Sequence, residues 1–349
     1  MLHRCGRRRF LSVAMGAGAS LGLGAMAVGG FRLARGLRAA TAAPLTDGLT
    51  AVTRTSWALG SDISITVAHS QAAAAEQAIE SAFRQLKLVD RLMSIYRPES
   101  QVSRLNQGRL LLDPHPYLVA LLQDARSLSQ QTNGAFDVTV QPLWVAYSEA
   151  KKAGELPSRH EIDKALEKVD WRQLDISPRR VQLRGSGGQI TLNGIAQGFA
   201  ADRVMESLRQ HGVEHALVNT GEIGTLGGKA KSQPWTIGIQ HPRQTNAYLR
   251  VVRLDGRCLA TSGDYATTFS ADYRDHHIFD PRLGRSPQYF SSVSVAARTA
   301  TAADALSTAA FVLGPEKGLE LIRATPEADA LLAFKDGTLL ATDNFPSCA

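Results

Sequence analysis

The sequence predicts an α+β fold that combines mixed and antiparallel sheets with packed helices. In residues 71–93, apolar side chains recur at three- and four-residue intervals, which is typical of an amphipathic helix. From Trp171 onward, short β-rich runs are interspersed with helical segments, without the regular strand–helix–strand order of a parallel sheet. With 349 residues and 44% hydrophobic composition, the chain can bury a large core. We therefore expect one domain over residues 56–349.

The individual elements follow from local patterns. Residues 62–67 alternate polar and apolar side chains as a half-buried strand does, and the helix over 71–93 follows. A second helix over 115–130 ends at Asn133-Gly134, a common left-handed stop. Further strands are expected at 189–192, 216–219, 235–239, 249–254 and 292–296, further helices at 198–211, around Asp304 and at 315–323, and a hairpin turn at Asp336-Gly337.

The N-terminus has the order of an export signal. Arg7-Arg8-Arg9 precedes Phe10-Leu11, and an uncharged, Gly/Ala-rich apolar run follows over residues 13–31. This order resembles a twin-arginine signal, which we assign to residues 1–43 with a tether over 44–55. The pattern predicts a periplasmic protein. An uncleaved signal that anchors the chain in the membrane is the alternative.

The net charge of +7 does not indicate a nucleic-acid-binding protein. Seven arginines precede Asp47, and no Asp or Glu occurs before it, so the exported chain would be nearly neutral. The three cysteines, Cys5, Cys258 and Cys348, are too widely separated to form a metal motif. The charge pattern therefore excludes nucleic acid as a partner.

The clearest chemical motif lies near the C-terminus. Asp304 and Thr308 are four residues apart in a run of helix formers, so both side chains project from one helical face. A carboxylate and a hydroxyl, completed by a backbone carbonyl or phosphate oxygens, are ligands that Mg²⁺ accepts. The spacing therefore predicts a magnesium site that binds a phosphate-containing ligand.

Other segments allow both a functional and a structural interpretation. The glycines after Thr191 enter a helix, where they suit either phosphate binding or tight packing. Phe136 and Asp137 could hold a planar ligand, or serve as core and cap. Tyr96 could likewise stack on a ring or stabilise a turn. The hydroxyls around Gly263 indicate either a ligand loop or a local turn, and the pair His276-His277, close to the candidate metal helix, favours chemistry.

Taken together, these segments resemble the ApbE family of FAD:protein FMN transferases, from about Trp57 to about Ile322. Seven stretches match in order, and their number makes the resemblance specific. They are Leu59-Gly60-Ser61, residues 93–98 with Ser100 and Asn106, residues 134–137, Gly194-Ile195-Ala196, and residues 261–265, 276–281 and 303–308.

The resemblance implies roles for individual residues. Mg²⁺ would be held by the carbonyl of Ala196 together with Asp304 and Thr308. His277 stands in place of a family histidine tied to activity, and Asp280 is a second candidate for the general base. The implied FAD contacts are Leu59, Tyr96, Ala135, Phe136, Asp137, Thr191 and Ile278.

The chain departs from the commoner family pattern at five positions. They are Leu59 for Met, Thr191 for Asp, Gln197 for Lys, Glu222 for a Gly-Asp pair and Leu283 for Thr. Gln197 can donate a hydrogen bond but supplies no charge, so phosphate or acceptor contacts there should be weaker. The run from Leu192 to Gly198 and Gly221-Glu222-Ile223 are more similar to the NosX branch, whose exported members flavinylate the membrane protein NosR.

The resemblance implies Mg²⁺-dependent transfer of FMN from FAD to a threonine hydroxyl of an acceptor protein, with release of AMP. The acceptor would be a NosR-like membrane protein of nitrous oxide reduction. Two alternatives stay open. The first is an FAD pyrophosphatase, in which water replaces the threonine. The second is an exported FAD-binding carrier or accessory protein that does not turn FAD over.

Overall fold

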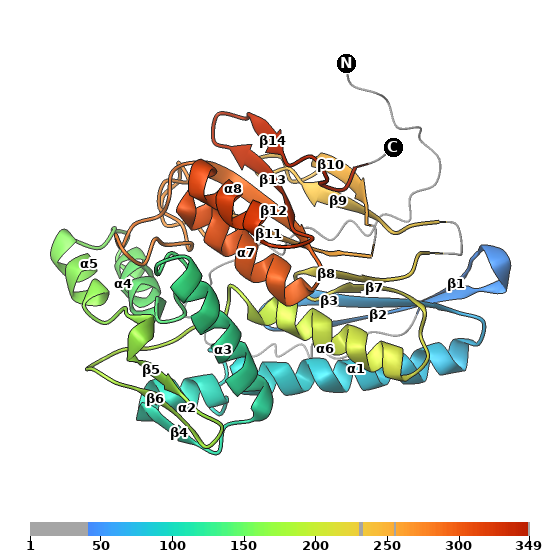
Figure 1. The fold of residues 1–349 in the computed structure, drawn as a ribbon, viewed down its shortest axis with the longest axis horizontal. Helices are drawn as coiled ribbons and strands as arrows, with labels where there is room; N and C mark the ends of the chain where they lie inside the picture. Colours follow the sequence, from blue (N-terminus) through green and yellow to red (C-terminus); the bar gives the residue numbers. More distant parts are fainter. Residues whose placement is uncertain (1–40, 230–232, 255, 348–349) are drawn as a thin grey trace.

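A nine-stranded antiparallel sheet forms the centre of the computed structural model, which describes residues 41–229, 233–254 and 256–347 (Figure 1). Its strand order is β1-β2-β3-β7-β8-β11-β12-β13-β14. The strands are β1 (Thr41–Pro44), β2 (Thr50–Ala58), β3 (Ser61–His69), β7 (His215–Asn219), β8 (Ile223–Leu226), β11 (Cys258–Gly263), β12 (Phe290–Ala297), β13 (Asp329–Phe334) and β14 (Leu339–Ala341).

Helices pack against one face of this sheet. They are α1 (Ala72–Met93), α6 (Ala196–Gln210), α7 (Ala300–Leu313) and α8 (Pro315–Ala324). Helix α1 buries the apolar stripe that its periodicity predicts, including Phe83, Leu86 and Val89. The side chain of Thr299 caps α7 by accepting from the amide of Ala302, and Gly314 ends the helix at a φ of 81°. This layer forms the main core.

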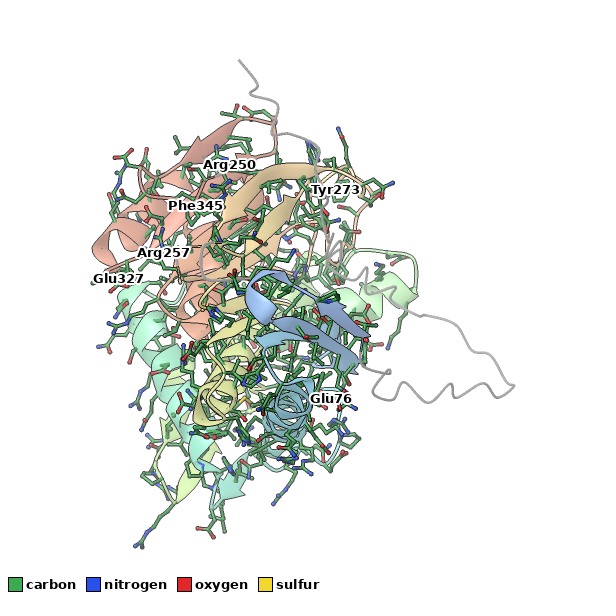
Figure 2. The ribbon with its side chains drawn as sticks, turned by 90° about the vertical axis from the view of Figure 1, so that its right-hand side faces the viewer. Glu76, Arg250, Arg257, Tyr273, Glu327 and Phe345 are labelled. Atoms are coloured by element: carbon green, nitrogen blue, oxygen red, sulfur yellow. The ribbon has the colours of Figure 1, made fainter. Side chains whose placement is uncertain are left out.

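A small second sheet covers part of the opposite face. It consists of β9 (Thr236–Gln240) and β10 (Tyr248–Arg253), which are antiparallel. Ile239 and Val252 pack with Leu259 of β11, and Phe345 from the C-terminal segment joins this cluster (Figure 2). The second layer therefore covers the sheet near β11–β13.

The middle of the chain forms a separate group of short elements beside the main sheet (Figure 1). Its three-stranded sheet has the order β4-β6-β5. The elements are α2 (Gln101–Gly108), β4 (Leu110–Leu112), α3 (Pro116–Gln131), α4 (Gln141–Lys152), α5 (Arg159–Leu166), β5 (Leu174–Ile176) and β6 (Arg180–Leu183), with a 3₁₀ turn at η2 (Trp171–Gln173). A further 3₁₀ turn, η1 (Thr46–Gly48), connects β1 and β2 of the large sheet.

The α+β prediction is confirmed, and two local predictions are wrong. Residues 50–55, expected in a tether, belong to β2, because this strand pairs with β3 along its whole length and buries Val52. The expected strand at 189–192 contains only one bridge residue, Gln189, because the segment touches residues 138–140 at a single parallel bridge to Val140 and one bond from the amide of Thr191 to the carbonyl of Val138. Residues 1–40 of the expected export signal lie outside the described residues. Within the described part, no helix is both long and apolar enough to cross a bilayer.

Candidate active site

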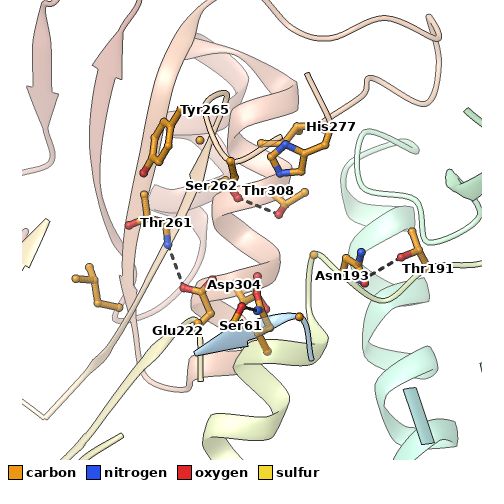
Figure 3. Close-up of a pocket in the computed structure, with 18 of the residues that line it drawn as sticks. Ser61, Thr191, Asn193, Glu222, Thr261, Ser262, Tyr265, His277, Asp304 and Thr308 are labelled. Atoms are coloured by element: carbon orange, nitrogen blue, oxygen red, sulfur yellow. Dashed lines mark hydrogen bonds between the residues drawn. The ribbon is translucent and has the colours of Figure 1, made fainter. Parts of the chain in front are cut away.

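A cavity of about 380 Å³ opens between the start of α6, the middle of α7, the β2–β3 turn and strand β9 (Figure 3). Its size is within the usual range of small-molecule sites. Most of the predicted site residues line it: Ala135, Phe136, Asp137, Thr191, His277, Ile278, Asp304 and Thr308. No lysine or arginine occurs among the described residues of the lining.

Asp304 and Thr308 face the cavity together from α7, as their spacing predicts (Figure 3). Asp304 Oδ2 accepts from the amide of Gly198 at 2.9 Å, and Thr308 Oγ1 lies 3.0 Å from Ser262 Oγ. A Cβ at Gly198 would lie 2.8 Å from the Cβ of Asp304, so glycine lets the start of α6 approach α7. Tight packing is therefore a role of this glycine.

Glu222, which is not among the site residues expected from the sequence, lies beside Asp304, directly before the start of β8 (Figure 3). Its Oε2 accepts from the amide of Thr261 at 3.2 Å. Burial, and then the nearby charge of Asp304, hold the pKa of Glu222 well above its usual range. Burial also raises the pKa of Asp304 to about 7. Two buried carboxylates thus meet without a cationic side chain between them.

This donor set suits a hard divalent cation. The carboxylates of Asp304 and Glu222 and the hydroxyl of Thr308 are oxygen donors, which Mg²⁺ prefers, and a cation would offset their mutual repulsion. The described residues contain no group of three His, Cys, Asp or Glu side chains arranged around one ion. Ala196, whose carbonyl was expected to join the site, is the buried first residue of α6. It is not part of the lining itself, although Gly194 and Gln197 are.

The two adjacent histidines have different environments. His276 is fully buried, and its Nε2 lies 3.1 Å from the carbonyl oxygen of Pro287. Burial lowers its pKa to about 3, so it is neutral. His277 lines the cavity, and its Nδ1 lies 3.2 Å from the carbonyl oxygen of Thr267. Because a carbonyl only accepts, Nδ1 of His277 carries the proton and Nε2 is left as an acceptor.

Asp280, the second candidate base, belongs to a turn beside the cavity. Its carboxylate accepts from Arg282 Nε at 2.8 Å and from Arg282 Nη2 at 2.6 Å. Asp280 is not part of the described lining, whereas the neighbouring Phe279 and Pro281 are. The arrangement makes Asp280 a residue that stabilises the turn, which leaves His277 as the better placed base.

Asp137 lines the cavity with its carboxylate occupied by the protein's own donors. Oδ1 accepts from the amide and the hydroxyl of Thr139, and Oδ2 accepts from the amide of Trp171 at 3.0 Å. Burial nevertheless raises its pKa to about 6. Asp137 therefore fixes the loop that presents Phe136 to the cavity.

Leu59 and Tyr96 lie at the rim and not in the lining. Leu59 and Gly60 both have positive φ, 51° and 79°, and form the two-residue turn between β2 and β3. The amide of Leu59 donates to Asp90 Oδ1 at 3.1 Å, which fixes this turn. A Cβ at Gly60 would lie 3.8 Å from the Tyr96 ring, so Tyr96 stands beside the cavity entrance.

Comparison with known proteins identifies the family. The ApbE family model matches residues 59–332. The chain belongs to the ApbE family. It is 33% identical over 292 residues to a FAD:protein FMN transferase of Treponema pallidum, covering 78% of this chain and 81% of the relative. It is also 33% identical to a FAD:protein FMN transferase of Haemophilus influenzae, covering 71% of this chain and 76% of the relative.

Solved ApbE structures share the fold. The crystal structure of the ApbE protein of Thermotoga maritima aligns with a TM-score of 0.76 at 28% identity, covering 84% of this chain and 98% of that one. The apo flavinyl transferase ApbE of Pseudomonas stutzeri aligns with a TM-score of 0.73 at 31% identity, covering 84% and 95%. The chain is thus a transferase of this family.

Proposed function

We propose that this ApbE protein transfers FMN from FAD to a threonine hydroxyl of an acceptor protein, with Mg²⁺ bound and AMP released. The observation that carries the proposal is the uncompensated carboxylate pair Glu222 and Asp304, placed with Thr308 and His277 in one cavity. The named activity of the relatives supports the choice of FAD as substrate.

The residues of the chain supply positioning and a proton acceptor. When bound, Mg²⁺ would supply a positive charge that offsets negative charge developing on the pyrophosphate. Asp304 and Thr308 would hold it, with Glu222 beside them. The threonine oxygen forms a bond to the phosphorus of the FMN half, the bond from that phosphorus to the AMP oxygen breaks, and Nε2 of His277 takes the threonine proton.

Because the described residues of the cavity wall include no lysine or arginine, the metal is more important here than at a site with its own cations. At the position where the family commonly has lysine, Gln197 donates from Nε2 to Ser61 Oγ at 2.6 Å. This contact fixes the amide next to the β2–β3 turn. The neutral Gln197 side chain therefore orients the turn but contributes no positive charge to the cavity.

The site of action in the cell rests on the sequence. The arginine-rich start followed by an apolar run supports export by the twin-arginine route to the periplasm. In the alternative, the signal is not cleaved and anchors the exported protein in the membrane. The segments around Gly198 and Glu222 support a NosX-like branch with a NosR-like acceptor in denitrification.

The test is a transfer assay with the purified mature domain, FAD, Mg²⁺ and a soluble acceptor fragment that carries an Asp/Ser-Gly/Ala-Ala-Thr type motif. We expect flavin fluorescence on the denatured acceptor, dependent on Mg²⁺ and abolished by EDTA. A second acceptor with valine in place of the target threonine is the matched control and should stay dark.

The same reaction distinguishes the alternatives by its products. Free FMN and AMP formed without labelled acceptor would indicate FAD pyrophosphatase activity. FAD recovered intact and stoichiometrically bound would indicate a carrier. Either result would overturn the transfer proposal.

A further inference from the structure

No described strand pairs with the second edge of β9, and at Thr236 and Gly238 this edge lies along the active-site cavity. All five of its residues, Thr236–Gln240, line the cavity. Successive side chains of a strand point to opposite faces, so a cavity that contacts every residue in turn follows the backbone edge. Among the described residues, β9 pairs with β10 on one side only.

The hydrogen-bond pattern between β9 and β10 shows which backbone groups of β9 face that edge. The amide of Leu254 donates to the carbonyl of Trp235, so these two residues form a hydrogen-bonded pair. Such pairs alternate with non-bonded ones along an antiparallel ladder. Thr236 and Gly238 therefore direct their backbone N–H and C=O groups away from β10, toward the cavity. Both residues are exposed.

The composition of β9 leaves this edge open to pairing. Exposed strand edges usually carry charges, prolines or bulges that prevent pairing with another chain. The neighbouring β10 has two of these features, the charges of Arg250 and Arg253 and a register shift after Tyr248. Strand β9 contains neither charge nor proline, and Gly238 presents no side chain.

The part of the cavity wall formed by the large sheet offers contacts for side chains of an added strand. Leu217 and Asn219 of β7, two residues apart, line it from one face of the large sheet, and Ile223 of β8 lies beside them. A chain that docks on β9 would form backbone hydrogen bonds with the strand and side-chain contacts with this wall. In strand addition, the backbone bonds usually provide affinity and the side-chain contacts provide specificity.

We propose that the cavity-facing edge of β9 at Thr236 and Gly238 binds the acceptor protein, whose segment with the target threonine adds to it as an extended strand. This inference rests on the proposed function, because only a protein acceptor requires such a surface. Asp304 is 4% exposed, so a threonine can reach the reacting phosphate only on a segment that enters the cavity. The edge continues into that cavity, which makes the acceptor segment its occupant.

Hydrogen–deuterium exchange tests the edge directly. The probe is a soluble acceptor fragment with its target threonine changed to valine, added to the full protein with FAD and Mg²⁺. Amides of residues 236–239 should exchange at least about tenfold more slowly with the fragment bound. Strand β14, an edge of the large sheet that does not line the cavity, should be unaffected. Bound fragment without slower exchange in β9 would overturn the proposal.

A pair of proline substitutions tests the same edge by kinetics. Thr236→Pro removes an N–H that points toward the cavity, whereas Arg253→Pro, directly opposite in the ladder, removes one that points toward the far edge of β10. We expect Thr236→Pro to lower kcat/KM for the acceptor about tenfold and Arg253→Pro to leave it near the wild-type value. Equal losses in both variants, or a matching loss of FAD affinity in Thr236→Pro, would overturn the assignment.

The two experiments separate failure of this inference from failure of the proposed function. If the wild-type protein labels no acceptor, transfer itself fails, and exchange still reports whether the fragment occupies β9. If the wild type labels the acceptor while β9 stays unprotected, the activity stands and the docking edge is wrong.

Discussion

Buried carboxylates occur in two kinds of surroundings in this molecule. Asp264, which is fully buried, accepts two bonds of 2.7 Å from Arg243 and lies 3.6 Å from Lys335, and Asp329 pairs with Arg257 at 2.7 Å. Glu222 and Asp304 instead face each other in a cavity whose described lining has no lysine or arginine. The first kind holds loops and strands together. The second kind provides negative charge that a bound cation can neutralise.

The pKa shifts follow the same division. Burial raises the pKa of Asp304 to about 7 and that of Glu222 well above its usual range, and the nearby charge of Asp304 raises the pKa of Glu222 further. The partner of Asp264 shows the opposite situation, because the hydrogen bonds to this carboxylate raise the pKa of Arg243 and so favour the ion pair. A buried charge without its own counter-charge marks the functional region.

The largest expected effect comes from removing one charge of the pair. In Asp304→Asn, transfer should fall by about 10³-fold, because a ligand of the proposed Mg²⁺ site and its charge are lost. Thermal unfolding without metal should be unchanged or shifted upward, since a buried charge is removed, and the stabilisation by added Mg²⁺ should disappear. Wild-type turnover in this variant would refute the metal assignment.

The same change at Asp264, the carboxylate paired with cations, should instead reduce stability and leave the response to Mg²⁺ unchanged. Asp264→Asn leaves Arg243 and Lys335 without their common partner, which should cost about 3 kcal/mol of unfolding free energy. Urea denaturation measures the cost. The response of the folded variant to Mg²⁺ should stay as in the wild type, and loss of that response would contradict the division between the two regions.

The adjacent histidines permit a pH test. The pKa of His276 falls from 6.5 to about 3 on burial, so its contribution to stability is present above pH 6.5 and is lost as the pH falls toward 3. Between pH 6.5 and pH 5 this amounts to about 2 kcal/mol. His276→Gln can keep a donor for Pro287 and does not titrate. Unfolding free energies across this range should therefore depend less on pH in the variant. If the wild type and the variant show the same pH dependence, His276 does not contribute to it.

The smallest expected effect is a gain. Glu222→Gln removes one of two facing buried carboxylates, so the metal-free protein should become more stable by about 1 kcal/mol. Chemical denaturation in EDTA measures it, and Glu206→Gln, which changes a side chain of α6 that is 46% exposed, is the control. A loss of stability on replacing Glu222 would show that its bond from Thr261 outweighs the repulsion.

Much of the site was predictable where its geometry is local. Asp304 and Thr308 lie on one helix, so a four-residue spacing already places both side chains on one face. His277 and Phe136, two further residues expected in the site, also line the cavity. Glu222 was missed as a site residue because nothing near it in sequence shows its partner, although it stood out as a departure from the family pattern.

The sequence by itself determined what depends on neighbours along the chain: the α+β class, the helices at 72–93 and 300–313, the turn at Asp336-Gly337 and the family. Only the tertiary structure decided what depends on distant partners. It gave residues 50–55 a strand partner, brought Glu222 to Asp304 and laid the edge of β9 along the cavity. Strand pairing and buried charge are long-range interactions, and local periodicity contains no information about which distant segment supplies the partner.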